Sequence, residues 1–557
     1  MIKPILLSIS ALFLSILLIP APARGCTSLI AAPGATDSGS TMITYAADSH
    51  VLYGELYEKQ GGRHEPGTMR QIVDWDTNIN RGEIPEAPVT YNRIGNMNQH
   101  GLTISESTWA CRPELEGSGM IDYGSLIYIA LERAKTAPEA IKVMTQLVDD
   151  YGYGSEGESF SIADPNQVWI LEMVGKGKSD PGAVWVARRI PDNAISGHAN
   201  LARIHTFPLK DKNTLYSKDV IDFARKQGYF NGEDKDFDFS RAYAVYDMGA
   251  LRGCDARVWA FFNRFATKGS MDKYLPWVTE GLGEPMPLWI VPEKKISATD
   301  MKWMMRDHFE DTPFDMTKDI GAGPFDVPYR WRPMEYEVDG QKYTHERAIA
   351  TQQTGFSFVA DMNPNRPRAM TGILWFGTDD ANTSVYIPVF NSTLNAPFEV
   401  SHGNGDMLTL SWDALFWVTN YVANQAYNRY SQMIPDIRKV QADLENSMTA
   451  AVDKAESDIA AMPYDQQCAV LDDITKYWAS KCTRDYKNLG DMLFVRYMDG
   501  NIKPLNPDGS FARTPEGVPV QPVFGGYNDR YFRSIVGEQG DRLKVKDVPQ
   551  QNTVSPQ

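Results

Sequence analysis

Hydrophobic residues near the start of the chain fall into short runs that are typical of β-strands. Residues 26–32 (CTSLIAA) form one run and residues 40–47 (STMITYAA) form a second, whereas residues 33–39 (PGATDSG) between them are turn formers. This order predicts an antiparallel hairpin. Such a hairpin would place Cys26 beside the end of the second strand, where Asp48 follows.

Two longer segments extend this pattern. Residues 123–151 have apolar positions at helical spacing and predict two helices, with Thr136 and Glu139 in the register of a capping box between them. Residues 160–174 (FSIADPNQVWILEMV) predict two strands that flank a turn at Asp164. The first half of the chain is therefore expected to combine β-sheet with a pair of helices.

The sequence becomes helical after about residue 410. Residues 411–433 and 434–462 are long stretches rich in Ala, Gln, Glu and Lys. The mixture of strands and helices predicts the α+β class. The expected division of the chain is a signal peptide at 1–25, a main domain at 26–405, a helical appendage of that domain at 406–500, and an irregular C-terminal segment with a disordered tail at 501–557.

The first residues have the pattern of a secretory signal peptide. A lysine precedes the apolar run 4–20, and Ala23 and Gly25 place small residues three and one before Cys26. A cut after Gly25 would make Cys26 the first residue of the mature chain, whereas a cut after Ala23 is the weaker alternative. We expect an exported protein, periplasmic or extracellular. A lipid attached to Cys26, with anchoring in the outer membrane, is the second alternative.

Composition and charge restrict the classes of partner. The chain has 557 residues, of which 43% are hydrophobic and 11% aromatic, and this is enough for a substantial core. A formal net charge of -16 argues against nucleic acid or an anionic membrane surface as a partner. Beyond the signal, no apolar stretch approaches the length of a membrane span.

The cysteines leave the question of disulfide bonds open. If Cys26 stays free, an even number remains, and in an oxidising compartment this favours at least one disulfide bond. In one unbroken helix, Cys468 and Cys482 would have Cα atoms about 21 Å apart, too far for a bond. Three pairings are possible among the remaining residues, which are Cys111, Cys254, Cys468 and Cys482.

Several common site motifs are missing. The pair His345 and Glu346 lacks the second histidine of a zinc-binding helix. Lys178 follows a glycine, as at the end of a phosphate-binding loop, but the first glycine of such a loop is missing. No Gly-x-Ser-x-Gly elbow occurs. We therefore predict no metal and no cofactor.

Cys26 can act as a nucleophile if it becomes the first residue. A free α-amino group has a pKa of about 7.7 to 8.0, so it can accept the thiol proton near neutral pH, directly or through water. The thiolate would attack a carbonyl and form a thioester, which water then hydrolyses. Asp48 would orient the ammonium form, although a solvated aspartate at a strand end is the plainer interpretation of this residue.

The whole mature length resembles a known family. It is similar to the cysteine dipeptidases of the dipeptidase A type, which belong to the N-terminal nucleophile hydrolase superfamily and are related to bile-salt hydrolases and penicillin V acylases. The resemblance implies a four-layer αββα fold with the C-terminal helices as an appendage. It rests on segments in this order: 26–28 (CTS), 37–43 (DSGSTMI), 48–49 (DS), 97–102 (MNQHGL), 106–108 (EST), 131–137 (LERAKTA), 164–165 (DP) with Trp169 and Glu172, 198–204 (HANLARI), 257–259 (RVW) and the helical stretch from Trp412.

The resemblance also implies roles for individual residues. Cys26 takes the position of the nucleophile, and Asp48 that of the carboxylate beside the amino terminus. Asn200 takes the position of an amide that stabilises the oxyanion, and Arg257 that of the arginine which polarises the cysteine. A second oxyanion donor should lie around Thr108. Structural roles remain the alternatives, as a turn residue for Asn200 and as an anchor of a surface carboxylate for Arg257.

Tyr45 departs from the family pattern, which usually has an arginine three residues before the aspartate. Either the lost charge weakens the site, or Tyr45 shapes the substrate pocket, which we favour. The predicted function is hydrolysis of dipeptides or short peptides. An N-acyl amide hydrolase with the same mechanism and a lipid-anchored binding protein are the alternatives. The sequence does not give the preferred dipeptide or the oligomeric state.

Overall fold

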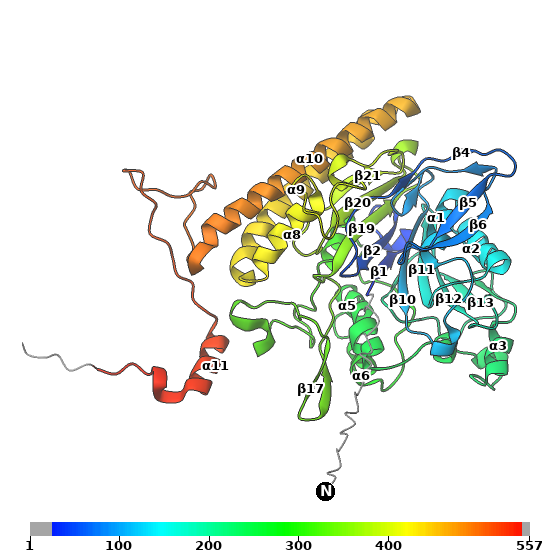
Figure 1. The fold of residues 1–557 in the computed structure, drawn as a ribbon, viewed down its shortest axis with the longest axis horizontal. Coiled ribbons are helices and arrows are strands. Elements are labelled where there is room, and N and C mark those ends of the chain that lie inside the picture. Colours follow the sequence, from blue (N-terminus) through cyan, green and yellow to red (C-terminus); the bar gives the residue numbers. More distant parts are fainter. Residues whose placement is uncertain (1–24, 548–557) are drawn as a thin grey trace, which may run out of the picture.

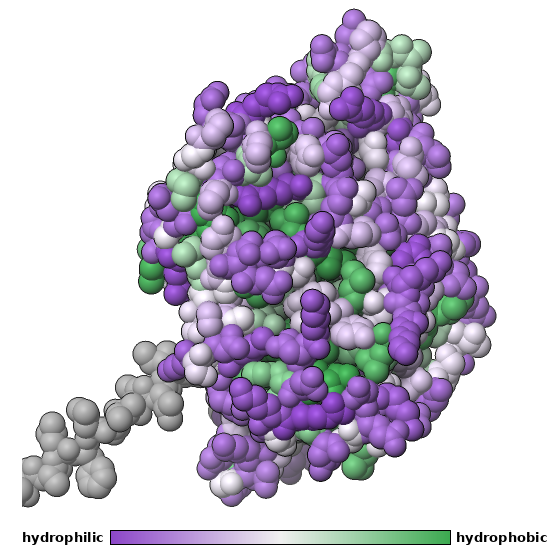
Figure 2. All heavy atoms as spheres, turned by 90° about the vertical axis from the view of Figure 1, so that its right-hand side faces the viewer, coloured by the Kyte–Doolittle hydropathy of each residue, from purple (hydrophilic) through white to green (hydrophobic). Residues whose placement is uncertain are grey.

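The computed structural model describes residues 25–547 (Figure 1). The predicted signal peptide, apart from Gly25, and the last ten residues of the predicted tail lie outside the described residues. Hydrophilic residues cover most of the face seen in Figure 2, and hydrophobic residues show there only in small groups.

Two antiparallel sheets form the centre of the molecule. The first contains the N-terminal strand in its interior, and the second contains the longest hairpin. In spatial order the first sheet consists of β16 (Trp289–Ile290), β14 (Ile195–His198), β1 (Ser28–Ala31), β2 (Thr41–Asp48), β19 (Thr354–Met362), β20 (Gly372–Thr378) and β21 (Ile387–Phe390). The second consists of β15 (Thr214–Tyr216), β13 (Ala183–Arg189), β12 (Gln167–Gly175), β11 (Gly157–Asp164), β10 (Thr103–Trp109), β9 (Met97–Asn98), β8 (Arg93–Ile94) and β3 (Glu58–Lys59).

The two sheets pack face to face, and helices cover their outer faces. Strand β2 contacts β10 and β11 of the opposite sheet. Every residue of β2, β10 and β11 is buried, as expected for strands that are covered on both faces. The helices α1 (Tyr123–Arg133), α2 (Ala137–Tyr151) and α3 (Val220–Gln227) contact the second sheet, and α5 (Ala256–Phe265), α7 (Ala298–Met304), α8 (Leu415–Ala426), α9 (Tyr430–Ile459) and α10 (Tyr464–Tyr497) contact the first. The predicted α+β class is confirmed.

Smaller elements lie around this centre. A π-helical segment, Gly249–Asp255, runs directly into α5. The hairpin of β5 (Met69–Val73) and β6 (Asn80–Pro85) lies beside α1 (Figure 1). The remaining helices and strands are α4 (Phe239–Tyr243), α6 (Leu275–Glu280), α11 (Asp529–Gln539), β4 (Gly62–Arg63) with β7 (Val89–Thr90), and β17 (Glu335–Val338) with β18 (Gln341–Thr344).

The hairpin predicted at the start of the chain is confirmed. Strands β1 and β2 pair antiparallel, with Ile30 opposite Ile43. The backbone N–H of Gly25 donates to the carbonyl of Asp48 at 3.2 Å, so the pairing continues to the end of β2. Cys26 therefore lies beside the residues that end the second strand.

The two predicted helices between residues 123 and 151 are also confirmed, as α1 and α2. The Thr136 side chain caps α2 by accepting from the N–H of Glu139. The carboxylate of Glu139 accepts from the N–H of Lys135, one residue earlier than in a complete capping box. The two strands predicted around Asp164 are β11 and β12.

The C-terminal helices differ from their predicted bounds. The boundary between the first two helices lies at residues 427–429, after α8, whereas the prediction put it between 433 and 434. Buried residues of α9 recur every three or four positions, as expected for one apolar stripe against the sheet. The segment 501–557, expected to be irregular, also contains α11. Asn528 caps this helix and its side-chain amide donates to the carbonyl of Gly323, and these contacts order the segment.

The expected disulfide bond is absent, because all five cysteines are free in the described structure. Cys468 and Cys482 lie on the unbroken helix α10, whose geometry separates them by about 21 Å. Cys482 is instead fully buried in the helical core. Within residues 25–547, none of the helices has both the length and the apolar character needed to cross a membrane.

Candidate active site

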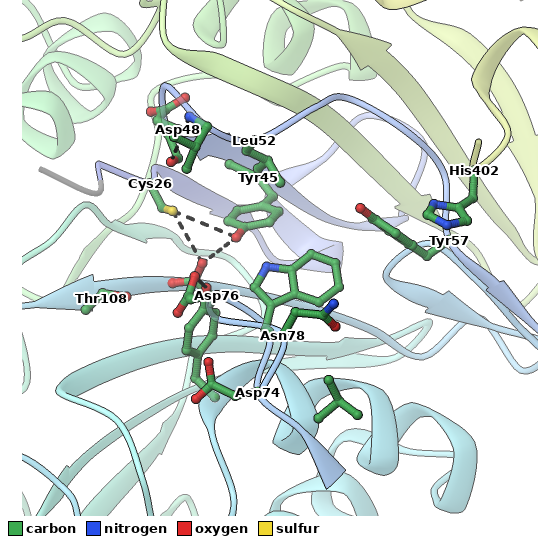
Figure 3. A pocket seen from close by; sticks show the side chains of 17 residues that line it. Cys26, Tyr45, Asp48, Leu52, Tyr57, Asp74, Asp76, Asn78, Thr108 and His402 are labelled. Atoms are coloured by element: carbon green, nitrogen blue, oxygen red, sulfur yellow. Dashed lines mark hydrogen bonds between the residues drawn. The ribbon is translucent and has the colours of Figure 1, made fainter. Parts of the chain in front are cut away.

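A cavity of about 490 Å³ opens beside the C-terminal end of β2. Its walls come from β2 and β10, from α1, from the turn between β5 and β6, and from the loop that holds His402. Figure 3 shows Cys26, Tyr45 and Asp48 together at one end of the cavity, with Tyr57 and His402 at the other. The cavity is large enough for a small molecule of the size of a short peptide.

The thiol of Cys26 contacts two side chains in the wall of this cavity. Its S–H donates to Oε1 of Glu106 at 3.3 Å, and its sulfur lies 3.8 Å from the hydroxyl oxygen of Tyr45. The Tyr45 hydroxyl also donates to the same oxygen of Glu106. Cys26 is only 7% exposed, and it forms part of the lining of the cavity.

The surroundings keep the thiol protonated. Burial, followed by the negative charges of Glu106 and Asp48, raises the pKa of Cys26 well above its ordinary value. A thiol with a raised pKa can act as a nucleophile only when a base takes its proton. Among the residues that the structure describes, no histidine hydrogen-bonds to this sulfur.

Asp48 is held by two side chains from a distant part of the chain. Its Oδ2 accepts from Arg347 at 2.6 Å, and its Oδ1 accepts from the hydroxyl of Thr354 at 2.7 Å. Burial raises the pKa of Asp48, whereas the charge of Arg347 opposes the rise. The same guanidinium donates to the carbonyl of Gly25. Asp48 and Arg347 therefore lie beside the peptide bond that joins Gly25 to Cys26.

Arg257 fixes the main chain of Cys26. This fully buried residue lies at the start of α5, and its Nη1 donates to the carbonyl of Cys26 and to the hydroxyl of Thr27, both at 2.7 Å. Its Nη2 donates to Oδ1 of Asn200 at 2.8 Å. Burial lowers the pKa of Arg257 to about 10, so it remains a cation near neutral pH. The hydrogen bond between Arg257 and Cys26 therefore goes to the backbone carbonyl of Cys26.

Asn200 and Thr108, the two expected oxyanion donors, hydrogen-bond within the protein. The side-chain amide of Asn200 donates to the carbonyl of Thr108 at 2.5 Å, and the Thr108 hydroxyl donates to Glu158 at 2.6 Å. Asn200 has a φ of 59°, in the left-handed region that asparagine tolerates. Thr108 lines the cavity, whereas Asn200 stands behind it. Asn200, Thr108 and Arg257 therefore belong to one hydrogen-bond network next to Cys26.

Two buried glutamates stand side by side on neighbouring strands of the second sheet. Glu106 is on β10 and Glu158 is on β11, and both are at most 1% exposed. Burial and the negative charge of Glu106 raise the pKa of Glu158 well above its ordinary value. Burial also raises the pKa of Glu106. Glu158 is therefore the member of the pair that keeps a proton, which leaves the charge on Glu106.

Comparison with known proteins identifies the family. The sequence model of Peptidase family C69 matches residues 63–443, which is more than half of the chain. The chain belongs to peptidase family C69. The matched range includes Glu106, Asn200 and Arg257, whereas Cys26 and Asp48 precede it.

Several curated relatives of this C69 peptidase have names that describe dipeptidases. A probable dipeptidase of Latilactobacillus sakei is 23% identical over 454 residues, which are 77% of this chain and 87% of the relative. A dipeptidase of Bifidobacterium longum (strain NCC 2705) is 22% identical over 552 residues, or 88% of this chain and 91% of the relative. Dipeptidase A of Lactobacillus helveticus is 21% identical over 404 residues, or 67% and 76%.

Sequence reasoning missed three residues of the site of this C69 peptidase. Glu106 is part of a segment that carried the resemblance, but no role was assigned to it. Glu158 stands in a strand with no motif around it, and Arg347 lies 299 positions after Asp48. For Glu106, a charged residue between two serines, Ser105 and Ser107, was the signal that could have been used. For Arg347 the sequence offers no signal.

Residues 25–547 contain no group of three or more metal-ligating side chains that could hold a metal ion.

Proposed function

We propose that this C69 peptidase is an exported cysteine dipeptidase whose nucleophile is Cys26, exposed as the first residue by removal of residues 1–25. The observation that carries the proposal is the placement of the Cys26 sulfur in the wall of the cavity, beside Tyr45 and Glu106. The family match and the names of the relatives support peptide hydrolysis. The small cavity favours short substrates.

The mechanism follows from the protonated thiol. When Cys26 is the first residue, its α-amino group, with a pKa of about 8, takes the proton from Sγ while the sulfur attacks the scissile carbonyl carbon. The carbon–nitrogen bond breaks, the proton passes to the leaving amine, and a thioester remains on Cys26. Water then hydrolyses the thioester, gives the free acid and restores the thiol.

The other residues of the site support this reaction. Asp48, held by Arg347, balances the charge of the α-ammonium group that forms when the amine accepts the proton. Arg257 fixes the carbonyl of Cys26 and so sets the direction of its side chain. We assign the amide of Asn200 and the segment at Thr108 as the donors to the oxyanion, and this role requires a shift of the hydrogen bonds that they now make.

The arrangement of two facing sheets between helices supports our assignment to the four-layer αββα fold of the N-terminal nucleophile hydrolases. The contact of α8, α9 and α10 with the first sheet supports their assignment as an appendage (406–500) of one domain that begins at residue 26. The irregular segment that follows carries α11.

An N-acyl amide hydrolase with the same nucleophile is the second candidate. Tyr57, Trp75 and Leu52 give the cavity an apolar side that could receive an acyl chain. A panel that contains dipeptides and N-acyl amino acids separates the two candidates, because the dipeptidase is expected to hydrolyse the former with higher kcat/KM.

The intact mass and the N-terminal sequence of the purified protein test the processing step. We expect an unmodified cysteine at position 26 as the first residue. A diacylglyceryl group on its sulfur, as in a lipid-anchored binding protein, or Arg24 as the first residue of active enzyme, would contradict the mechanism.

Substitution of the nucleophile tests the chemistry. Cys26→Ala should abolish turnover without unfolding the protein, and Cys26→Ser should leave a trace, because a hydroxyl is the poorer nucleophile. If Cys26→Ala kept more than about a tenth of the wild-type kcat/KM, a loss below about 1.4 kcal/mol, the assignment would be wrong. A chelator such as EDTA should leave the rate unchanged.

A further inference from the structure

The cavity is rich in negative charge. Among the residues that the structure describes, no lysine or arginine lines it. Asp48 pairs with Arg347, and Asp74 pairs with Arg81 at 2.8 Å. Within residues 25–547, by contrast, Glu106 forms no ion pair. The four carboxylate residues of the lining are Asp48, Asp74, Asp76 and Glu106.

Among the described residues, no cation pairs with the buried carboxyl group of Glu106. Its side chain is 1% exposed, and its Oε1 accepts from the Cys26 thiol and from the hydroxyl of Tyr45. Its Oε2 is buried and accepts no hydrogen bond from the described part of the chain. The Glu158 side chain lies next to Glu106. A buried carboxylate in this position is costly unless a cation arrives to balance it.

The covalent structure of a dipeptide brings its cation to this place. The α-carbon of the first residue is bonded both to the scissile carbonyl carbon and to the ammonium nitrogen. For attack, the Cys26 sulfur stands about 3 to 3.5 Å from that carbonyl carbon. The ammonium nitrogen is two bonds away from the same carbon. Oε1 of Glu106, at 3.3 Å from the same sulfur, is within reach of the ammonium.

We propose that the Glu106 carboxylate binds the free α-ammonium group of the first residue of the substrate, and that Tyr45 positions this carboxylate by its hydrogen bond. The proposal rests on the proposed function and adds to it the residue that requires a free amino terminus. An N-acylated substrate brings no positive charge, so it leaves Glu106 buried and unbalanced. Glu106 therefore selects dipeptides over N-acyl amides by a difference in charge.

The test compares Glu106→Gln with the wild-type enzyme on L-alanyl-L-alanine and on its N-acetyl derivative. Gln has the shape of Glu without its charge. We expect kcat/KM for the free dipeptide to fall by about 30-fold or more, and kcat/KM for the N-acetyl derivative to fall much less, so that the preference between them collapses. Glu158→Gln is the matched control, and its preference should stay as in the wild type, because Glu158 is already neutral. Equal losses of Glu106→Gln on both substrates would overturn the proposal.

A binding measurement separates this proposal from the proposed function. Alkylation of Cys26 by iodoacetamide is followed with and without L-alaninamide, which carries the α-ammonium, and with N-acetyl-L-alaninamide, which does not. L-Alaninamide should protect the thiol of the wild type but not of Glu106→Gln, and the N-acetyl compound should protect neither. If the wild type hydrolyses no dipeptide but shows this pattern, the proposed function fails and the ammonium site stands. Equal protection by both compounds would contradict the site.

Discussion

Arg347 donates to Oδ2 of Asp48 at 2.6 Å although 299 positions separate the two residues in the chain. The Asp48 side chain is completely buried, and that of Arg347 is 10% exposed. The same guanidinium reaches the carbonyl of Gly25. One arginine therefore connects the end of β2 with the residue that precedes the proposed nucleophile.

Removal of this arginine should affect both stability and activity. Arg347→Gln leaves the buried carboxylate of Asp48 without its cation, so we expect a loss of about 3 to 5 kcal/mol in the free energy of unfolding. We also expect kcat/KM to fall about tenfold or more, because Asp48 would be protonated and could not balance the α-ammonium group. Chemical denaturation and steady-state kinetics measure the two effects.

The matched control for that experiment is Arg252→Gln. Arg252 is a partly exposed arginine that pairs with Glu346, next to Arg347 in the sequence. Its substitution should change stability by less than about 1 kcal/mol and leave kcat/KM close to the wild-type value. Comparable losses in the two variants would show that Arg347 acts only as a general structural residue.

Variants of Tyr45 test the hydrogen bond to Glu106. Tyr45→Phe removes this bond. Its main effect should be on the ranking of dipeptide substrates, with a smaller effect on the free energy of unfolding. Tyr45→Arg places a cation beside Glu106 and Cys26. It should lower the pKa of the thiol but compete with the substrate ammonium for Glu106, so kcat/KM for free dipeptides should fall.

The outcome of the Tyr45 series is read from a dipeptide panel and from pH profiles of kcat/KM. An increase in kcat/KM with Tyr45→Arg would instead favour the view that a missing positive charge limits this enzyme. Unchanged ranking and unchanged profiles in both variants would remove Tyr45 from the site altogether.

The reactivity of Cys26 should depend on pH in a way that follows from its surroundings. Burial, Glu106 and Asp48 raise the pKa of the thiol well above its ordinary value. Since only the thiolate reacts with iodoacetamide, alkylation near pH 7 should be slower than for a free cysteine, and it should keep rising with pH without a plateau below about pH 9. Mass spectrometry of Cys26 over a pH series measures this rate. A plateau near pH 7 would show a stabilised thiolate and contradict the expectation.

Glu132 gives a prediction for stability. It is buried on α1 and pairs with Lys59 at 2.8 Å and Arg93 at 2.9 Å, and also with Arg70. Burial opposes ionisation, but these charges prevail and lower the pKa of Glu132 from 4.5 to about 2. Because the folded pKa is depressed, the stabilisation is fully present above pH 4.5 and is lost as the pH falls toward 2.

Glu132→Gln should therefore cost about 3 kcal/mol in the free energy of unfolding at pH 7, and the difference from the wild type should shrink between pH 4.5 and pH 3. Glu83→Gln, at an exposed glutamate of the neighbouring β6, should change stability by less than about 0.5 kcal/mol at any of these pH values. A difference that stayed constant with pH would show that packing, and not charge, explains the loss.

The sequence by itself determined the elements whose partners are close along the chain. The pairing of β1 with β2 follows from two apolar runs and a short turn, so the position of Cys26 beside Asp48 could be predicted from residues 26–48. The helices α1 and α2 follow from local periodicity in the same way. Here local preference and tertiary packing favour the same structure.

Only the tertiary structure decided which charges surround the sulfur. Glu106 reaches Cys26 because the two sheets face each other, and Arg347 reaches Asp48 because its segment packs against the end of β2. The even number of remaining cysteines suggested a disulfide bond, but all five cysteines are free in the described part of the chain. Contacts between distant segments depend on how whole layers pack, and no residue pattern within one segment records its partner in another.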